Sequence, residues 1–504
     1  MAGDLMVFDV TLITNLFGDF TPLAPMLIML FGALIMPATY FATKKRVAVT
    51  ALMLVIIAIS LFINIVLMVE GYTGTYAGLF EYDAMTGLMI LLFQIVVFLV
   101  AMVSASSTET TRLHYGAYNS LLLAATVGMM FVAASNDLIT IFVGVELTSI
   151  SSYALVAMKR SDPRAAEAAV KYVIIGGLST ALTIYGLSML YGVTGTTNIA
   201  DIATALSMGE FTWAFGIAMI TMIAGYGFKI AAVPFHMWAP DVYEGAATPV
   251  SMFLATGSKK MGILVFFKIF LVMFVAGSAV SAFATVEVQY IFAIIAAITM
   301  TVGNVVAISQ NNIKRMLAYS SIAQAGYILI VMAVMTEYAV AGGLFHMFTH
   351  VFMKGGAFLI VGALICVGVG EKISDYRGLF SRNKFLAIAM LIFLFSLAGI
   401  PPLAGFTSKF ILFSAAIYVD GAVVTQWVWL AFIAIINSAI SLYYYARVIK
   451  AMYIEKGEVK EKISIPMPFT IAIVVCIVFT IVLGLFPQLI MDFCADAAAA
   501  LFGH

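Results

Sequence analysis

The chain has 504 residues, of which 63% are hydrophobic and only 10% are charged, and its formal net charge is zero. A soluble globular domain carries about 25% charged residues, so this composition excludes a soluble globular protein. Many apolar runs reach about 20 residues, the length that a helix needs to cross about 30 Å of hydrocarbon. The segments of about ten alternating residues that are typical of a transmembrane β-barrel are absent. The sequence therefore predicts an all-α integral membrane protein.

The apolar runs predict about fourteen membrane-spanning helices. No cleavable signal peptide is expected, because the first twenty residues contain acidic side chains and no basic stretch before an apolar core. Short loops join most helices, so residues 1–504 are expected to form a single polytopic membrane domain. The predicted spans cover residues 22–43, 47–69, 79–103, 117–135, 137–158, 170–191, 211–235, 247–276, 287–309, 317–336, 338–367, 385–419, 425–449 and 466–490.

The basic residues predict the orientation of these helices. The chain contains 25 Lys and Arg. Six are lysines well inside predicted spans, and all the others fall in loops that follow odd-numbered helices or at the helix ends that border these loops. Loops after even-numbered helices carry carboxylates instead, such as Glu70 and Asp201. Because basic loops stay in the cytoplasm, both termini are expected outside the cytoplasmic membrane.

The six lysines inside spans are unusual, since a charge near the bilayer centre costs about 2.5 to 3.5 kcal/mol. Lys259 lies about twelve residues into the eighth span, roughly 18 Å along a helix and near mid-membrane. Lys354 is similarly deep, and both are predicted to be functional. Lys268 lies nearer a helix end, which favours extension of its ammonium group to the interface. The others are Lys229, Lys409 and Lys260, whose role the sequence leaves open.

Two predicted helices contain breaks. Pro234 and two glycines surround Lys229 in the seventh, and Pro401 and Pro402 interrupt the twelfth ahead of Lys409. Proline removes a backbone hydrogen bond and clashes with the preceding turn. Unwound backbone at membrane depth is tolerated only where it is buried in protein or lines a wet cavity. Two such breaks, five helices apart, indicate an inverted-repeat transporter with one ion site in each half; packing kinks without function are the alternative.

One carboxylate, Glu146, lies deep in a predicted helix among hydroxyl side chains. A lysine within about 4 to 6 Å would keep it charged, and Lys229 is the predicted partner. Such a pair can switch protons, because separation of the two charges lets the lysine release its proton. A static salt bridge is the alternative interpretation.

His346, His350 and Lys354 are spaced four residues apart and share one face of the eleventh helix. An imidazole with an ordinary pKa of about 6.5 suits proton relay, with structural hydrogen bonding as the alternative. A metal site would need further ligands, and no Cys or acidic residue lies nearby on this helix. The three cysteines also lack metal or redox spacing.

A third group of titratable residues lies on the predicted cytoplasmic side. His236, Asp241 and Glu244 occur in PFHMWAPDVYEGAATP, the one odd-numbered loop without a basic residue. They are candidates for proton uptake. Pairing with a basic loop of a neighbouring subunit, or capping of the eighth helix, are the alternatives.

These motifs resemble the antiporter-like subunits of respiratory complex I and its relatives, and the N subunit most of all. The resemblance implies two inverted five-helix repeats, helices 4 to 8 and 9 to 13, with breaks in helices seven and twelve. The repeats cover residues 117–276 and 287–449, after helices 1 to 3 at 22–103 and before helix 14. The motifs are FKIAAVPFHMWAPDVYEGAATPV at 228–250, NNIKRMLAYSSIAQAGYILI at 311–330 and GIPPLAGFTSKF at 399–410.

The resemblance also implies roles for single residues. Glu146 and Lys229 match the charged pair of the first half-channel, Lys259 matches the central lysine and Lys409 the exit residue. His346 and His350 match histidines that are more typical of the M and L subunits. Protons are therefore expected to move along Glu146, Lys229, Lys259, Lys354, Lys409, His346 and His350.

By this resemblance the chain is a proton-translocating subunit that holds no cofactor itself. Flavin and iron–sulfur clusters are expected in partner subunits. Electron transfer there is expected to change the pKa values of the lysines in this chain and so to drive proton movement. The expected partners are membrane subunits of the M, L, K, J, A and H types, a peripheral redox arm and the lipid bilayer, with no nucleic acid.

Several points stay open at this stage. The electron donor is NADH, reduced coenzyme F(420) or reduced ferredoxin, the acceptor is a quinone or methanophenazine, and the ion is a proton or sodium. An Mrp-type sodium/proton antiporter subunit is the main alternative, and a structural scaffold with paired charges is another. The motif APDVYEGA at 239–246 favours the N subunit over the M and L subunits and over Mrp-type chains.

Overall fold

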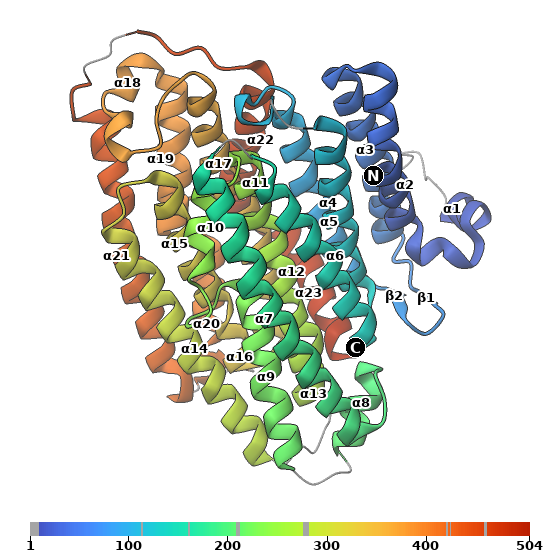
Figure 1. Ribbon diagram of the computed structural model, residues 1–504. Helices are drawn as coiled ribbons and strands as arrows, with labels where there is room; N and C mark the ends of the chain where they lie inside the picture. Colours follow the sequence, from blue (N-terminus) through green and yellow to red (C-terminus); the bar gives the residue numbers. More distant parts are fainter. Residues whose placement is uncertain are drawn as a thin grey trace, which may run out of the picture.

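The computed structural model describes residues 10–111, 114–159, 162–207, 212–275, 282–419, 422–423, 425–457 and 461–503. Most of these residues form helices that run side by side (Figure 1). Within the described ranges, twelve helices are long and apolar enough to cross a membrane. The predicted all-helical membrane class is confirmed. Arg112, Arg160 and Lys460, three of the basic loop residues, lie outside the described residues.

The chain begins with helices and a small hairpin that precede the candidate site. In the hairpin, Gly74 pairs with Tyr82 in antiparallel register. These elements are α1 (Val10–Phe17), α2 (Ala24–Thr43), α3 (Arg46–Val69), β1 (Gly74–Tyr76), β2 (Phe80–Tyr82) and α4 (Ala84–Ser104).

The next helices carry Glu146, Lys229 and Lys259. They are α5 (Tyr115–Ala134), α6 (Leu138–Ala157), α7 (Pro163–Thr194), α8 (Ile199–Ser207), α9 (Trp213–Ile230), α10 (Trp238–Gly245), α11 (Thr248–Phe253), α12 (Lys259–Phe266) and α13 (Val272–Val275).

The remaining helices carry His346, Lys354 and Lys409. They are α14 (Ala282–Ile308), α15 (Ile313–Ile328), α16 (Ile330–Val334), α17 (Glu337–Cys366), α18 (Leu379–Arg382), α19 (Lys384–Ala398), α20 (Ala404–Ala415), the strand pair β3 (Tyr418–Val419) and β4 (Ala422–Val423), α21 (Val428–Tyr453), α22 (Met467–Leu485) and α23 (Gln488–Phe502).

Polar side chains at the loop ends define where several of these helices begin. Asp137, Asn312 and Thr336 each accept hydrogen bonds from backbone N–H groups in the first turn of α6, α15 and α17. Such caps satisfy N–H groups that have no partner inside the helix. The helix boundaries that position the site thus follow from local sequence.

Both predicted breaks are confirmed. Helix α9 ends one residue after Lys229, where Ala231 has a φ of 57°, and helical structure resumes at α10. Helix α19 ends at Gly399, which has a φ of 93°, and α20 begins after Pro401 and Pro402. A left-handed residue ends a helix because it turns the chain away from the helix axis.

The eighth predicted span is also interrupted, which the sequence did not predict. Two π-helical segments, Leu254–Ser258 and Phe267–Leu271, lie on either side of α12. The first directly precedes Lys259 and the second contains Lys268. Single π-helical turns inside α-helices are frequent at functional sites. This interruption and the break between α19 and α20 explain why predicted spans 247–276 and 385–419 are absent from the twelve continuous helices.

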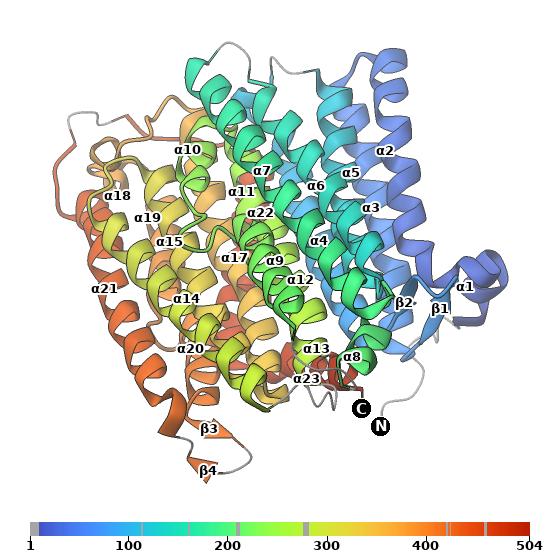
Figure 2. The same ribbon diagram turned by 60° about the horizontal axis from the view of Figure 1, so that its bottom comes forward.

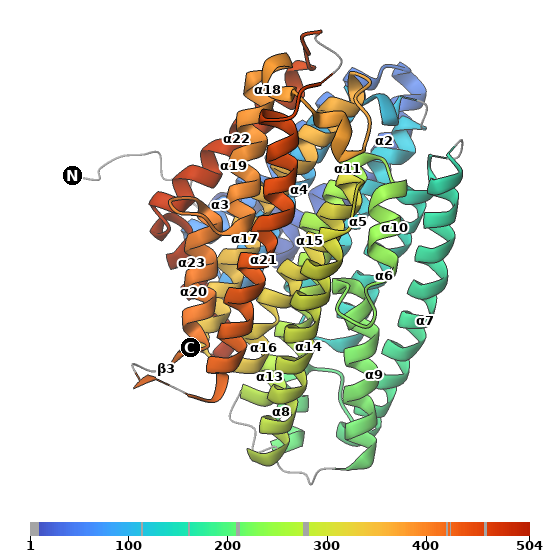
Figure 3. The same cartoon turned by 90° about the vertical axis from the view of Figure 1, so that its left-hand side faces the viewer.

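The loops segregate to two ends of the bundle. The short helices α10 and α18 lie at one end, and α8 and α13 lie at the other (Figure 3). Helix α23, which the sequence did not predict, lies at the α8 end (Figure 2). It packs against α17 and α4. The basic residues Lys171 and Arg315 contact Asp241 of α10, so these two lie at the α10 end.

Candidate functional site

All six lysines inside the predicted spans are buried, with exposed fractions of 4% or less. Lys268 was expected to extend its ammonium group to the interface, and in the structure this residue is buried against another helix. Its Nζ donates a hydrogen bond to the backbone oxygen of Ser135 at 3.0 Å, and another to that of Ala133. Carbonyls at the C-terminal end of a helix lack partners and attract a cation, so the end of α5 holds this ammonium group inside the protein.

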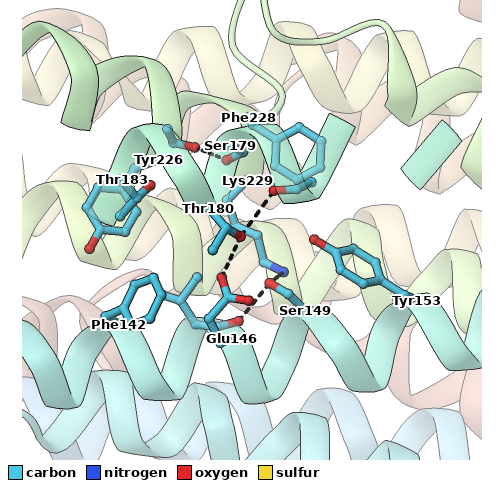
Figure 4. Close-up of a pocket in the computed structure, with 13 residues that line it drawn as sticks. Phe142, Glu146, Ser149, Tyr153, Ser179, Thr180, Thr183, Tyr226, Phe228 and Lys229 are labelled. Carbon is cyan, nitrogen blue, oxygen red and sulfur yellow. Dashed lines mark hydrogen bonds between the residues drawn. The ribbon is translucent and has the colours of Figure 1, made fainter. Parts of the chain in front are cut away.

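Glu146 and Lys229 line one small pocket between α6, α7 and α9 (Figure 4). Lys229 Nζ donates to Ser149 Oγ at 2.9 Å. Thr180 Oγ1 donates to Glu146 Oε1 at 2.8 Å. Among the ion pairs of the described ranges, none joins Glu146 to Lys229, although the Glu146 charge acts on the lysine. The two predicted partners thus share a pocket, with a hydroxyl group bound to each.

Of these two hydroxyl groups, one was recognisable in the sequence. Ser149 lies three residues after Glu146, on the same side of α6. Thr180 comes from α7, and no local pattern links it to Glu146. The site therefore contains a hydroxyl-bound lysine beside a hydroxyl-bound carboxylate, an arrangement in which either group can change its charge without losing every partner.

Lys259 lies at the start of α12, directly after the first π-helical segment. Its Nζ has no hydrogen-bond partner among the described residues. The ammonium group lies 5.6 Å from the centroid of the Tyr243 ring, which comes from α10. A cation is attracted to the face of an aromatic ring. The break in the seventh span thus supplies, through α10, the side chain that contacts Lys259.

Lys260, the residue after Lys259, is buried as well. It acts electrostatically on His346 and His350 of α17. The sequence left the role of Lys260 open, and in the structure the charge of Lys259 also acts on it. Lys354, further along α17, donates to Ser320 Oγ of α15 at 2.6 Å.

The break between α19 and α20 holds Lys409. Its Nζ donates to the backbone oxygens of Leu397 at 2.7 Å and Ala398 at 3.3 Å, and to Ser438 Oγ at 3.0 Å. Leu397 and Ala398 are the last residues of α19, whose carbonyls have no partner inside that helix. The proline-containing break predicted from the sequence therefore creates the oxygen ligands of this lysine.

His346 and His350 share one face of α17, as predicted, and their ring centroids are 6.1 Å apart. Ser408 Oγ and Gln324 Oε1 lie 2.9 Å and 3.0 Å from the two ring nitrogens of His346. Neither ring nitrogen of His350 has a hydrogen-bond partner within the described ranges. In the same ranges, no group of three or more His, Cys, Asp or Glu could hold a metal ion.

The carboxylates proposed for proton uptake are paired within the chain. Asp241 accepts from Lys171 at 2.6 Å and from Arg315 at 2.5 Å, and Arg315 also donates to Glu244 at 2.9 Å. Burial raises the pKa of Asp241, but its bonds with Lys171 and Arg315 outweigh burial and hold that pKa below its usual value. His236 lies in the break between α9 and α10.

One buried ion pair, at the end of the bundle that contains α10, was not predicted from the sequence. Glu109 and Lys314 have side-chain exposures of 6% and 0%, and their charged atoms lie 4.0 Å apart. Glu109 also accepts from the backbone N–H of Thr248 at 2.9 Å, at the start of α11. Lys314 Nζ donates to the backbone oxygen of Ala246 at 2.8 Å. The pair therefore holds the beginning of the helical segment that leads to Lys259.

Comparison with known proteins gives a consistent result. A family model described as the NADH:quinone oxidoreductase/Mrp antiporter membrane region matches residues 135–441. The F(420)H(2) dehydrogenase subunit N of Methanosarcina mazei is 42% identical over 448 residues, which cover 86% of this chain and 88% of that protein. The NADH-quinone oxidoreductase subunit N of Nitrosomonas europaea is 36% identical over 486 residues, which cover 96% and 98% of the two chains.

Solved structures show the same fold. A chain in respiratory complex I from Thermus thermophilus superimposes with a TM-score of 0.77 at 27% identity, covering 93% of this chain and 98% of that one. A chain of the Mrp complex from a Dietzia species has a TM-score of 0.84 at 21% identity, covering 95% and 97%. At that identity, the second likeness concerns the fold alone.

Proposed function

The chain belongs to the family of membrane subunits found in NADH:quinone oxidoreductases and Mrp antiporters, and from this premise we propose that it translocates protons as the N-type subunit of a complex I-type oxidoreductase. One observation carries the proposal. The chain buries a series of lysines, and each of those we assign to the path contacts different oxygen or aromatic groups. A buried charge is expensive, so a chain that retains several uses them.

The chemistry of lysine supports proton transfer. A lysine binds or releases a proton according to the charges around it, whereas arginine stays charged in proteins. Charges interact more strongly inside the protein than in water, so a change at one site alters its neighbours. Lys354 is subject to the charges of Lys259, Lys260 and Lys409. We propose a path from Glu146 and Lys229 through Lys259, Lys354, His350 and His346 to Lys409.

The finer architecture belongs to the same proposal. We propose fourteen spans, of which helices 4 to 8 and 9 to 13 form inverted repeats, and a cytoplasmic end that contains α10 and α18. Both termini then lie outside. The equivalent positions of the two breaks, each beside a buried lysine, support this arrangement. His236, Asp241 and Glu244 lie near the cytoplasmic end, where protons would be taken up.

The redox chemistry is assigned to partner subunits. Subunits of the M, L, K, J, A and H types and a peripheral arm with flavin and iron–sulfur clusters would complete the enzyme. The names of the relatives support F(420)H(2) or NADH as electron donor, with reduced ferredoxin as a further candidate, and a quinone or methanophenazine as acceptor. This chain would contribute proton movement alone.

An Mrp-type antiporter subunit is the second candidate, because the description of the matching family model includes Mrp antiporters. The identity of 42% to an F(420)H(2) dehydrogenase subunit N favours the first. Purification of the native chain separates the two. Copurification with flavin and iron–sulfur subunits is the expected result, and a preparation that lacks both would overturn the oxidoreductase assignment.

Proton translocation is tested with membrane vesicles that contain the assembled complex. Donor oxidation and acidification of the vesicle lumen are measured together for Lys229→Ala and Glu146→Gln. We expect both variants to lose most of the acidification. Lys384→Ala, at an exposed position at the start of α19, is the control. Full acidification by normally assembled Lys229→Ala and Glu146→Gln complexes would exclude the proposed path.

A further inference from the structure

His346 is hydrogen-bonded on two sides by side chains from different helices. It lies on α17 with an exposed fraction of 0%. Its Nδ1 is 2.9 Å from Ser408 Oγ on α20, and its Nε2 is 3.0 Å from Gln324 Oε1 on α15. The bonds of these two partners determine what each ring nitrogen can do.

Gln324 determines which nitrogen always carries hydrogen. The Gln324 side-chain nitrogen donates to the backbone oxygen of Leu397 at 3.2 Å. A carbonyl can only accept, so the amide nitrogen faces Leu397 and the amide oxygen faces His346. Since that oxygen can only accept, His346 Nε2 carries hydrogen whether the ring is neutral or charged. Nδ1 is therefore the atom at which His346 gains or loses a proton.

Ser408 fits both states of Nδ1. Its hydroxyl oxygen lies 2.9 Å from Nδ1 and 3.3 Å from the backbone oxygen of Gly405, one turn earlier in α20. When His346 is neutral, the hydroxyl donates to Nδ1. When Nδ1 carries a proton, the hydroxyl accepts from it and turns its own hydrogen to Gly405. A hydroxyl is suited to this because it both donates and accepts.

The same network includes the proposed exit lysine. Lys409 follows Ser408 in the chain, and its Nζ donates to the Leu397 carbonyl, which also accepts from Gln324. The charges that act on His346 are Lys409 on α20 and Lys260 on α12, and His350 is its titratable neighbour on α17. A proton on His346 therefore lies near the positive charges of Lys260 and Lys409. Lys409 also belongs to the hydrogen-bond network of His346.

We propose that Ser408 is a positioning residue for proton transfer at His346. Its hydroxyl reverses direction when Nδ1 gains or loses a proton, so both charge states of His346 stay hydrogen-bonded beside Lys409. Ser408 keeps its own hydrogen throughout: once its hydroxyl has turned to Gly405, the proton that Nδ1 gains comes from His350, the preceding group of the proposed path, and it leaves Nδ1 for Lys409. The inference rests on the proton translocation proposed above.

The test compares pH profiles of redox-driven acidification from about pH 5 to pH 9, the range that brackets histidine titration. In Ser408→Ala, the charged imidazole has a buried N–H without an acceptor, which disfavours it by about tenfold or more. We expect the profile to move by about one pH unit towards lower pH. Ser408→Thr keeps the hydroxyl and should retain the wild-type profile.

A double-mutant comparison shows whether Ser408 acts through His346. In a His346→Gln background, Ser408→Ala should cause no further shift, because the titrating group is already absent. Ser414→Ala is the control on the same helix, since its hydroxyl bonds to the Ile411 carbonyl at 2.9 Å. It should leave the profile unchanged. If Ser408→Ala assembles poorly, Ser408→Cys provides the same comparison with a weaker hydrogen-bonding group.

The outcomes separate this inference from the proposed function. A Ser408→Ala or Ser408→Cys profile that coincides with wild type, while Lys229→Ala abolishes acidification, overturns the role of Ser408 alone. A shift of equal size in the His346→Gln background also overturns it. Acidification that is independent of Lys229 overturns the proposed function instead.

Discussion

Glu109 accepts a hydrogen bond from the backbone N–H of Thr248 at 2.9 Å, and so connects the loop after α4 to the beginning of α11. An anion at a helix N-terminus is stabilised by the unpaired N–H groups there. Lys314 lies 4.0 Å from the same carboxylate. This contact between distant parts of the sequence leads to two predictions.

Glu109→Gln should destabilise the folded protein by about 1 to 3 kcal/mol, because it weakens a buried charge-assisted bond and leaves Lys314 with fewer partners. Thermal unfolding in detergent, followed by circular dichroism, measures the change. Glu455→Gln is the matched control, since its partner Arg377 is 54% exposed, and exposed ion pairs contribute about 0 to 1 kcal/mol. Equal losses in both variants would contradict the importance of the buried pair.

The stability of the protein should fall in acid through Glu109. Burial raises the pKa of this carboxyl. The charges of Lys314 and Lys159 and the hydrogen bonds with Thr248 outweigh burial and lower the pKa below its usual value. A carboxyl with a lowered folded-state pKa contributes stability above its unfolded pKa of about 4.3 and loses it as the pH falls through the folded value. The unfolding temperature of Glu109→Gln, plotted from neutral pH to about pH 3, should fall less steeply than that of wild type. Parallel curves would refute this linkage.

Lys229→Arg separates a need for positive charge from a need for proton release. Arginine keeps the charge beside Glu146 but does not release its proton at physiological pH. We therefore expect normal assembly with at least a tenfold loss of acidification per donor oxidised, a change of about 1.4 kcal/mol or more in the transfer barrier. If Lys229→Arg pumps as wild type does, the lysine serves only as a fixed charge.

Gly405 is expected to tolerate no side chain. A Cβ atom at this position would lie 1.8 Å from the backbone oxygen of Ser396, so α20 would have to move away from α19. Gly405→Ala should cost about 1 to 3 kcal/mol or more, by analogy with overpacked cores. Gly192→Ala, where a Cβ meets nothing within 4 Å, is the control and should be neutral or slightly stabilising. Unfolding temperatures of the two variants make the comparison, and equal values would contradict close packing at Gly405.

The features that sequence predicted are those with local causes. Prolines and glycines marked the breaks beside Lys229 and Lys409, and four-residue spacing placed His346 and His350 on one face. Both outcomes depend on backbone geometry within a few residues. The partners of Lys268 could not be predicted, because position along a helix says nothing of the neighbouring helix end, where the carbonyl of Ser135 binds its ammonium group.

The features that sequence missed depend on contacts between distant segments. Thr180 binds Glu146 across 34 positions in the chain, and Lys314 binds the Ala246 carbonyl across 68. The periodicity of a sequence cannot predict hydrogen-bond partners that lie this far apart in the chain. The π-helical segments around α12 also had no marker, because their residues are compatible with an ordinary α-helix.

Helix α17 is continuous over 30 residues, whereas the seventh, eighth and twelfth predicted spans are interrupted. At 1.5 Å per residue it is about 45 Å long, and it carries His346, His350 and Lys354. An unbroken helix keeps the spacing of its side chains. If α17 moves as one body, the distances from His346, His350 and Lys354 to Lys259 and Lys409 change only when the segmented helices around it are displaced.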